Sequence, residues 1–485
     1  MRQCLTSDLG GYYTANSPSD RDQFGANGDF VTSPEISQIF GELLGIWFYA
    51  EWVSQGKKSE GVYLMEMGPG RGTLMDDMLR VSGDVATYMD KPLLTPTQTI
   101  RNFTPFASAI EAVYLVEASA SLREAQHKLL CGDNPLREND VGYESVSRHS
   151  PDLKIVWAED LLLVPREANK TPFVIAHEFF DALPIHVFQS VPPAPRADQT
   201  SNSIQTPTGP IPNPRKQQPG NQWREMLVSP KPPHLLKEGE PEFELTLSRA
   251  ATPHSVYLPE TSHRYLAMKK TEEATIEISP ESQAFARDLA IRLGGSYPSS
   301  PQSQPSTATQ GRTVSSAAKE EPLQKPSPSG AALIIDYGTP SIIPTDSLRG
   351  IKAHNLTSPF SSPGATDISA DVDFLALAES AINASPGVEV HGPLDQARFL
   401  RAMGIEERAA QLVKRAMTKA GEGQEKGELT ELVKRVEGGW TRLVDTGPSG
   451  MGKLYQVMAL LPYRPEEEKA KGKRRPVGFG GDVQL

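Results

Sequence analysis

The feature that most limits the possible folds is a short apolar run that leads directly into three closely spaced glycines. It lies in "VYLMEMGPGRGTLMDDMLR", residues 62–80, and a second apolar pattern with helical spacing begins at Leu74. A strand, a glycine-rich loop and a helix in this order form the unit with which open α/β sheets bind nucleotide-like ligands. The stretch therefore predicts an α/β fold with a ligand site at the glycines.

The alternation of strand and helix continues along the chain. Four more short apolar runs lie at residues 113–117, 154–158, 172–176 and 332–336, with helical patterns between several of them. Because parallel strands are joined by helices that cross over the sheet, this rhythm predicts a mostly parallel, doubly wound, Rossmann-like sheet. Near the end, "TRLVD" and "KLYQVMALL" flank a Gly-Pro-Ser-Gly turn, which is typical of a β-hairpin.

Composition suggests where the chain leaves this core. Only 38% of the 485 residues are apolar and 42 are prolines, so we expect unstructured insertions. The predicted organisation is an N-terminal helical segment covering the ligand (1–60), the first half of the core (61–190), a disordered insertion (191–222), extra β segments and a helix (223–295), a second disordered insertion (296–329), the continuation of the core (330–371), a helical insertion (372–436), a terminal β-hairpin (437–463) and a disordered tail (464–485).

Charge and cysteine content exclude several classes of protein. The net charge of −11 argues against general affinity for nucleic acid, since neutralising phosphates requires a basic surface. Two cysteines, Cys4 and Cys131, are too few for a disulfide framework or a cysteine-based zinc site. No stretch approaches 18 apolar residues, so we expect no membrane insertion. The opening "MRQCLTSDLGGYY" contains no arginine-rich leader or signal peptide, so it does not predict a compartment.

The spacing of the glycines indicates which ligand they hold. Gly68 and Gly70 are followed by Thr73 where a dinucleotide fingerprint needs a third small residue, and the pattern is instead E-x-G-x-G-x-G, from Glu66 to Gly72. An acidic residue directly ahead of the loop would repel a pyrophosphate. It suits the ammonium and sulfonium groups of S-adenosylmethionine.

Acidic residues at the next strand ends favour the same ligand. Glu117 closes the second strand, where a carboxylate can accept both ribose hydroxyls. Glu159 and Asp160 follow the third strand, where they could meet the adenine amino group. Together with the glycines, these positions predict S-adenosylmethionine rather than a dinucleotide.

Two other motif matches are rejected, and no metal site is predicted. "GPSGMGKL" (447–454) resembles a P-loop, but Leu454 replaces the serine or threonine that binds magnesium, and a strand follows instead of a helix. "HEFFD" (177–181) resembles the zinc-protease motif, but Asp181 replaces the second histidine and Pro184 prevents a long helix.

A capped helix precedes the first strand. In "GDFVTSPEISQIFGELLGIW" (28–47), Thr32 and Glu35 form a capping box and Pro34 suits the first turn. The helix could simply pack, through an apolar stripe that begins at Ile36. Alternatively, its first turn covers the cofactor and offers N–H groups to the carboxylate of the methionine moiety.

Two further carboxylates follow the fourth strand. Glu178 and Asp181 lie in "FVIAHEFFDALPIHVF" (173–188), at the edge where doubly wound folds bind ligands. Carboxylates among apolar residues are unfavourable unless a cation meets them. They form either a structural cap or ion pair, or a pocket for a cationic acceptor such as a guanidinium.

Several of these motifs together carry a family resemblance. Seven stretches of the chain resemble the MidA-like protein-arginine methyltransferase family. In order, they are "GDFVTSPEISQIFGELLG", "LMEMGPGRGTLM", "YLVEASASLREAQ", "AHEFFDALP", "IIDYG", "PGATDISADVDF" and "DQARFLRAMGI". The likeness runs from Met1 to about Leu461, interrupted by the Pro/Ser-rich insertions. His177 stands where many relatives have asparagine.

The resemblance implies a specific enzyme. The family has a class I S-adenosylmethionine-dependent methyltransferase core with an added helical region, and its mitochondrial members are respiratory complex I assembly factors. It implies type II activity, the symmetric ω-N dimethylation of an arginine on the core quinone-site subunit of complex I, in the mitochondrial matrix. The residues expected to bind the cofactor are Thr32, Ser33, Pro34, Glu35, Glu66, Gly68, Pro69, Gly70, Gly72, Glu117 and Asp160.

The expected chemistry depends on carboxylates. A guanidinium stays protonated near neutral pH, so the enzyme must orient one nitrogen towards the methyl group and neutralise the cation. Our hypothesis gives the main guanidinium contact to Glu178 with support from Asp181, while Asp336 either supports the pocket or stabilises a turn. The alternatives are an assembly chaperone with little or no turnover, whose partner surface includes "WREMLV" and "FELTL", and a small-molecule methyltransferase.

Overall fold

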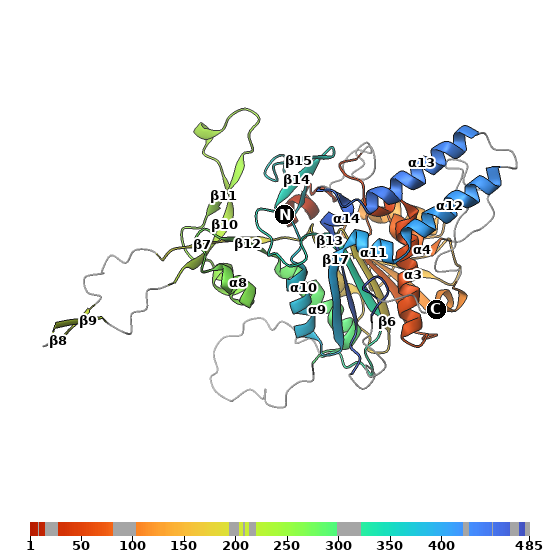
Figure 1. Cartoon of the computed structure of the whole chain (residues 1–485), viewed down its shortest axis with the longest axis horizontal. Coiled ribbons are helices and arrows are strands. Elements are labelled where there is room, and N and C mark those ends of the chain that lie inside the picture. Colours follow the sequence, from red (N-terminus) through yellow and green to blue (C-terminus); the bar gives the residue numbers. More distant parts are fainter. Residues whose placement is uncertain are drawn as a thin grey trace.

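A nine-stranded sheet forms the centre of the molecule (Figure 1). The computed structural model describes residues 1–7, 9–14, 28–80, 103–193, 203–206, 209–212, 220–297, 322–420, 426–448, 450–465 and 475–480. The strand order in this sheet is β17 (Val388–Asp395), β18 (Tyr455–Pro462), β13 (Ala331–Tyr337), β6 (Thr171–His177), β1 (Val62–Met67), β2 (Ile110–Val116), β5 (Lys154–Ala158), β4 (Tyr143–Val146) and β3 (Arg137–Glu138).

The five apolar runs are the five parallel strands at the middle of this sheet, which confirms the predicted doubly wound class. β13, β6, β1, β2 and β5 are parallel neighbours, while β18 runs antiparallel to β13. All six residues of β1 are buried. Val62 and Leu64 belong to one hydrophobic core, and Tyr63 and Met65 belong to the other, because successive side chains of a strand point to opposite faces.

Helices cover both faces of the sheet. On one face lie α3 (Gln38–Ser54), α4 (Thr73–Leu79), α12 (Ile405–Ala420) and α13 (Lys426–Leu443), whose apolar residues join the core that contains Val62. On the other face lie α9 (Pro280–Gly294) and α10 (Phe374–Ala384), which pack beside each other (Figure 1). α6 (Ala120–Cys131) connects β2 to β3.

A second, four-stranded antiparallel sheet lies to one side of the main sheet (Figure 1). It contains the two extra β segments predicted from the sequence, which are β10 and β11. Two short helices, α7 (Pro253–Tyr257) and α8 (His263–Met268), lie between its last two strands in the chain. The strand order is β11 (Phe243–Leu247), β10 (Gln222–Pro230), β7 (His186–Val191) and β12 (Thr275–Ile278). A smaller sheet contains β15 (Asn355–Thr357), β14 (Arg349–Lys352) and β16 (Asp367–Ser369).

The predicted terminal hairpin is wrong. Residues 441–443 end helix α13, and β18 pairs instead with β17 and β13. β17 lies inside the segment predicted to be a helical insertion. Its burial is only partial, with Val388 as its one fully buried residue, so its sequence lacks the apolar run that marks the inner strands.

Parts of the predicted disordered segments are structured. A hairpin of β8 (Ser203–Thr206) and β9 (Gly209–Pro212) lies in the stretch 191–222. In the tail, the carbonyl of Val477 accepts a hydrogen bond of 3.0 Å from Trp47 Nε1, and the ring of Phe479 contacts that of Phe399. Most of 296–329 lies outside the described residues. Among the helices that are described, none combines the length and the apolar character needed to span a membrane.

Candidate functional site

A cavity of about 430 Å³ opens at the carboxyl ends of β1, β2, β5 and β6, where the sequence predicts a ligand. Its size suits a small-molecule site. Ten of the residues predicted to form the site line it, and Ser33, Gly72 and Asp181 do not. The ten are Thr32, Pro34, Glu35, Glu66, Gly68, Pro69, Gly70, Glu117, Asp160 and Glu178.

The glycine loop has the backbone conformation that its composition predicts. Gly68, Gly70 and Gly72 all have positive φ angles, of 63°, 54° and 82°, which residues other than glycine rarely adopt. A Cβ atom at Gly68 would lie 2.9 Å from the ring of Phe179. Gly72 is the N-cap of α4, so the loop turns directly from β1 into this helix.

Glu66 places a buried acid at the base of the cavity. Its side chain is almost fully buried, and Oε2 makes no hydrogen bond to any described residue. Burial, together with the nearby charge of Glu117, raises the pKa of Glu66 to about 8. A buried carboxylate oxygen without a partner is unfavourable in isolation, and a cation bound in the cavity would relieve this penalty.

Glu117 is held in place by its own loop and by α6. Its Oε1 accepts a hydrogen bond from the backbone N–H of Ser119 (2.8 Å), and its Oε2 accepts one from Gln126 Nε2 (3.0 Å). Gln126 Nε2 also donates to the carbonyl oxygen of Gly70 (2.6 Å), so one side chain ties the two loops together. Burial raises the pKa of Glu117 to about 7, although these hydrogen bonds oppose the shift.

Asp160 is an exposed residue that lines the cavity. Its Oδ1 accepts a hydrogen bond of 2.8 Å from the backbone N–H of Leu162 and so caps the short helix η2 (Leu161–Leu163). Its neighbour Glu159 is also exposed and also lines the cavity. Both therefore lie where the sequence predicts the third acidic position.

The predicted capped helix is divided into two. α2 (Ser33–Ile36) ends at Ser37, whose φ of −155° is extended, and Ser37 then caps α3. The capping contact is present, because the N–H of Thr32 donates to Glu35 Oε2 at 3.3 Å. The backbone N–H of Ser33 bonds to the carboxylate of Glu178, so this helix terminus is directed at the predicted acceptor residue.

Glu178 has the most unusual environment in the cavity. Its φ of 51° is rare for a residue with a side chain, and it follows the last residue of β6. Its Oε1 accepts a hydrogen bond of 2.8 Å from the hydroxyl of Tyr455. Burial and the charge of Asp181 raise the pKa of Glu178 to about 8, so a cation in the cavity would favour its ionised form.

The other two predicted acids lie behind Glu178. Asp181 does not line the cavity; burial raises its pKa to about 6, while the positive charge of Arg349 opposes this shift. Asp336 is fully buried and stabilises the turn, the second of the two roles considered for it. It accepts hydrogen bonds from the backbone N–H groups of Phe179 (3.1 Å), Phe180 (2.8 Å) and Tyr337 (2.8 Å).

Two aromatic neighbours of Glu178 are not predicted by the sequence. Tyr455 is on β18, 277 positions away in the chain, and no local pattern connects the two residues. His177 lines the cavity with Nε2 at 3.3 Å from Glu178 Oε1, but Nε2 makes no hydrogen bond to a described residue. Burial lowers the pKa of His177 to about 3, so this ring is neutral at physiological pH.

Comparisons with known proteins relate the chain to methyltransferases. The model of a family described as "Putative S-adenosyl-L-methionine-dependent methyltransferase" matches residues 43–394. The "Protein arginine methyltransferase NDUFAF7, mitochondrial" of Mus musculus is 31% identical over 468 residues, which cover 96% of this chain and 80% of that protein. The Homo sapiens protein of the same name is 31% identical over 472 residues, covering 96% and 79%.

A solved structure supports the fold. A COG1565 superfamily member from Burkholderia thailandensis, crystallised with S-adenosyl-homocysteine, aligns with a TM-score of 0.57 at 19% identity. The alignment covers 99% of this chain and 87% of the bacterial one.

Proposed function

The chain belongs to the MidA-like family of S-adenosyl-L-methionine-dependent methyltransferases, and from this we propose that it methylates arginine side chains of a protein. The methyl donor is S-adenosyl-L-methionine. The names of the mouse and human relatives support arginine as the acceptor. The single observation in this molecule that carries the proposal is the position of Glu178, a carboxylate that is only 12% exposed and lines the cavity beside the glycine loop.

The residues around the glycine loop suit this donor. Glu66 has a buried oxygen without a partner and would hold the cationic methionine moiety, while Glu117 would accept the ribose hydroxyls. The positive φ angles of Gly68 and Gly70 allow the backbone to approach a ligand closely. The bound donor supplies an electrophilic methyl group on a positively charged sulfur.

The carboxylate of Glu178 would bind and orient the arginine that accepts the methyl group. Glu178 would pair with the guanidinium, and Tyr455 and Ser33 fix the carboxylate by donating hydrogen bonds to it. The methylated guanidinium must release one proton. Glu178, ionised by its pairing with the guanidinium, would accept that proton, whereas His177, with a pKa lowered to about 3, is too weak a base.

The finer parts of the proposal come from the resemblance. We propose symmetric ω-N dimethylation, the core quinone-site subunit of respiratory complex I as substrate, and the mitochondrial matrix as location. The word "mitochondrial" in the relatives' names supports the last of these.

The experiment that tests the proposal follows the methyl group to its acceptor. The purified protein is incubated with isotope-labelled S-adenosylmethionine and the isolated quinone-site subunit, and the peptides are mapped by mass spectrometry. We expect label on arginine, as symmetric dimethyl-arginine. Replacing Gly70 by valine should abolish both donor binding and label, because valine is strained at a φ of 54°. Donor binding by the wild-type protein without label on the subunit would contradict the proposed substrate.

A further inference from the structure

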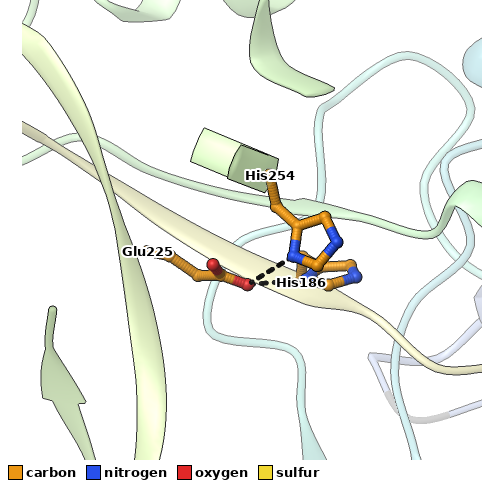
Figure 2. Close-up of side chains that lie close together, drawn as sticks. All are labelled: His186, Glu225 and His254. Carbon is orange, nitrogen blue, oxygen red and sulfur yellow. Dashed lines mark hydrogen bonds and ion pairs between the residues drawn. The ribbon is translucent and has the colours of Figure 1, made fainter. Parts of the chain in front are cut away.

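Three potential metal ligands meet in the second sheet, outside the residues that line the cavity. They are His186 on β7, Glu225 on β10 and His254 on α7 (Figure 2). Their ligand atoms all lie within 4.8 Å of one another. We propose that they bind a divalent transition-metal ion, with zinc as the best match. The sequence predicts no metal here, since the three residues are far apart in the chain and form no motif.

The two histidine rings approach the same oxygen of Glu225. His186 Nδ1 lies 2.7 Å and His254 Nδ1 lies 3.6 Å from Glu225 Oε1 (Figure 2). The ring centroids of the two histidines are 4.3 Å apart. Nitrogen and oxygen ligands at about 2.0–2.2 Å from a tetrahedral zinc are about 3.3 Å from each other. The two nitrogen–oxygen distances, 2.7 and 3.6 Å, lie on either side of this value, so small side-chain movements would complete the site.

A neighbouring hydroxyl fixes the orientation of the carboxylate. Thr252 donates a hydrogen bond to Glu225 Oε2, which leaves Oε1 on the side of the histidines. The same hydroxyl accepts a hydrogen bond from the N–H of Ser255 (3.0 Å) and so caps α7, the helix that carries His254. One residue therefore orients one ligand and positions the helix of another, as outer-shell partners do in metal sites.

The ligand set and its exposure indicate how such an ion would be bound. Two imidazoles and one carboxylate form a set typical of zinc, and three protein ligands leave a fourth position for water. The side chain of Glu225 is only 7% exposed, whereas that of His254 is 56% exposed, so the site is closed towards the sheet and open to solvent. A bound ion would cross-link β7, β10 and α7. Because it would bind the folded state, zinc should stabilise the protein.

The test measures zinc binding by the whole chain without a histidine tag. Zinc is titrated by equilibrium dialysis with elemental analysis, and thermal unfolding is followed in parallel. His254→Ala removes an exposed ligand and leaves the contact between His186 and Glu225, so it should fold normally. Glu225→Gln keeps the size of the central ligand. His263→Ala, at an exposed histidine on α8, is the matched control.

We expect one zinc ion per chain and a rise in the unfolding temperature when zinc is added. Both His254→Ala and Glu225→Gln should weaken binding by about tenfold or more, while His263→Ala should behave like the wild type. The proposal is overturned if the wild type binds no zinc at micromolar concentration, which would make the cluster a histidine–carboxylate ion pair only. Equal affinity of His254→Ala and wild type would also overturn it.

Discussion

At the scale of single residues, the cavity combines two acidic side chains whose ionised forms are unfavourable without a bound cation. Glu66 is buried and Glu178 is only 12% exposed, and the pKa of each is raised to about 8. Neither has a cationic partner among the described residues that line the cavity next to it. Two such carboxylates on the wall of one cavity suit two cations, and the proposed function supplies them as the methionine moiety of the donor and the guanidinium of the acceptor.

Replacing Glu66 by glutamine should stabilise the ligand-free protein and weaken donor binding. Between the ordinary pKa of 4.5 and the raised value of about 8, folded Glu66 keeps a proton that the unfolded chain releases. The free energy of unfolding of the wild type therefore decreases as the pH rises through this range. Glutamine does not titrate, so the variant does not show this decrease. At pH 9 we expect the variant to gain on the order of 2–4 kcal/mol in unfolding free energy.

Urea unfolding of both proteins at pH 5 and pH 9 measures this difference. The gain should be small at pH 5, and the dissociation constant for S-adenosylmethionine should rise at least tenfold. An equal stability difference at the two pH values would show that Glu66 does not titrate in this range.

The raised pKa of Glu178 predicts how acceptor binding depends on pH. Below about pH 8 the carboxyl is largely protonated in the absence of a cation, and only the ionised form attracts a guanidinium. The KM for the protein substrate should therefore fall by about tenfold between pH 6.5 and pH 8.5, while the dissociation constant of the donor changes less. Steady-state kinetics across this range provides the measurement. A KM that does not change with pH would contradict the proposed role of the carboxyl group.

At the scale of elements, the sequence predicts well whatever depends on neighbouring residues. Each inner strand is a continuous apolar run, because a strand covered on both faces buries every side chain. The glycine loop follows β1 directly, and Glu117 and Asp160 follow β2 and β5, so the strand order alone brings them to one edge.

What the sequence did not predict depends on contacts between distant segments. β18 joins the sheet beside β13 and brings Tyr455 to Glu178. The sequence predicts Asp181 in the acceptor pocket because it follows the fourth strand at the ligand-binding edge, but in the structure it does not line the cavity. The break at Ser37 was missed because the apolar stripe continues across it.

The hydrogen bond from Tyr455 to Glu178 allows the contribution of β18 to the site to be tested. This hydrogen bond favours the ionised form of Glu178, so Tyr455→Phe should raise the pKa of that carboxyl further. The pH at which the acceptor KM falls should then move upwards by on the order of one unit. Tyr257→Phe, at an exposed tyrosine on α7, should leave the profile unchanged. A Tyr455→Phe variant with reduced turnover but the wild-type pH profile would indicate a purely structural role.

At the scale of the whole molecule, the N-terminal residues close the cavity over the sheet. Arg2 and Leu5 of α1 (Arg2–Thr6) line the cavity together with Tyr13. Leu5 also packs in a small hydrophobic cluster with Ile368 of β16, and the hydroxyl of Tyr13 donates to Asp367 at 2.9 Å. The N-terminal residues form no strand of the main sheet, so we expect them to contribute mainly to ligand binding and little to the stability of the fold.

Removing residues 1–14 should therefore affect the donor more than the fold. We expect the dissociation constant of S-adenosylmethionine to rise at least tenfold, since one wall of the cavity is lost. Circular dichroism should still report the helices and the sheet, and unfolding should stay cooperative. Unchanged donor affinity in the shortened protein would show that the N-terminal residues do not close the cavity.

The central claim is that Glu178 serves the acceptor and not the donor, and one paired measurement tests it most directly. Donor affinity by calorimetry and methyl transfer to arginine are compared for the wild type, for Glu178→Gln and for the exposed control Glu167→Gln. We predict that Glu178→Gln lowers transfer by about 100-fold or more and changes donor affinity by less than about threefold, while the control matches the wild type. Near-normal transfer by Glu178→Gln would contradict the account.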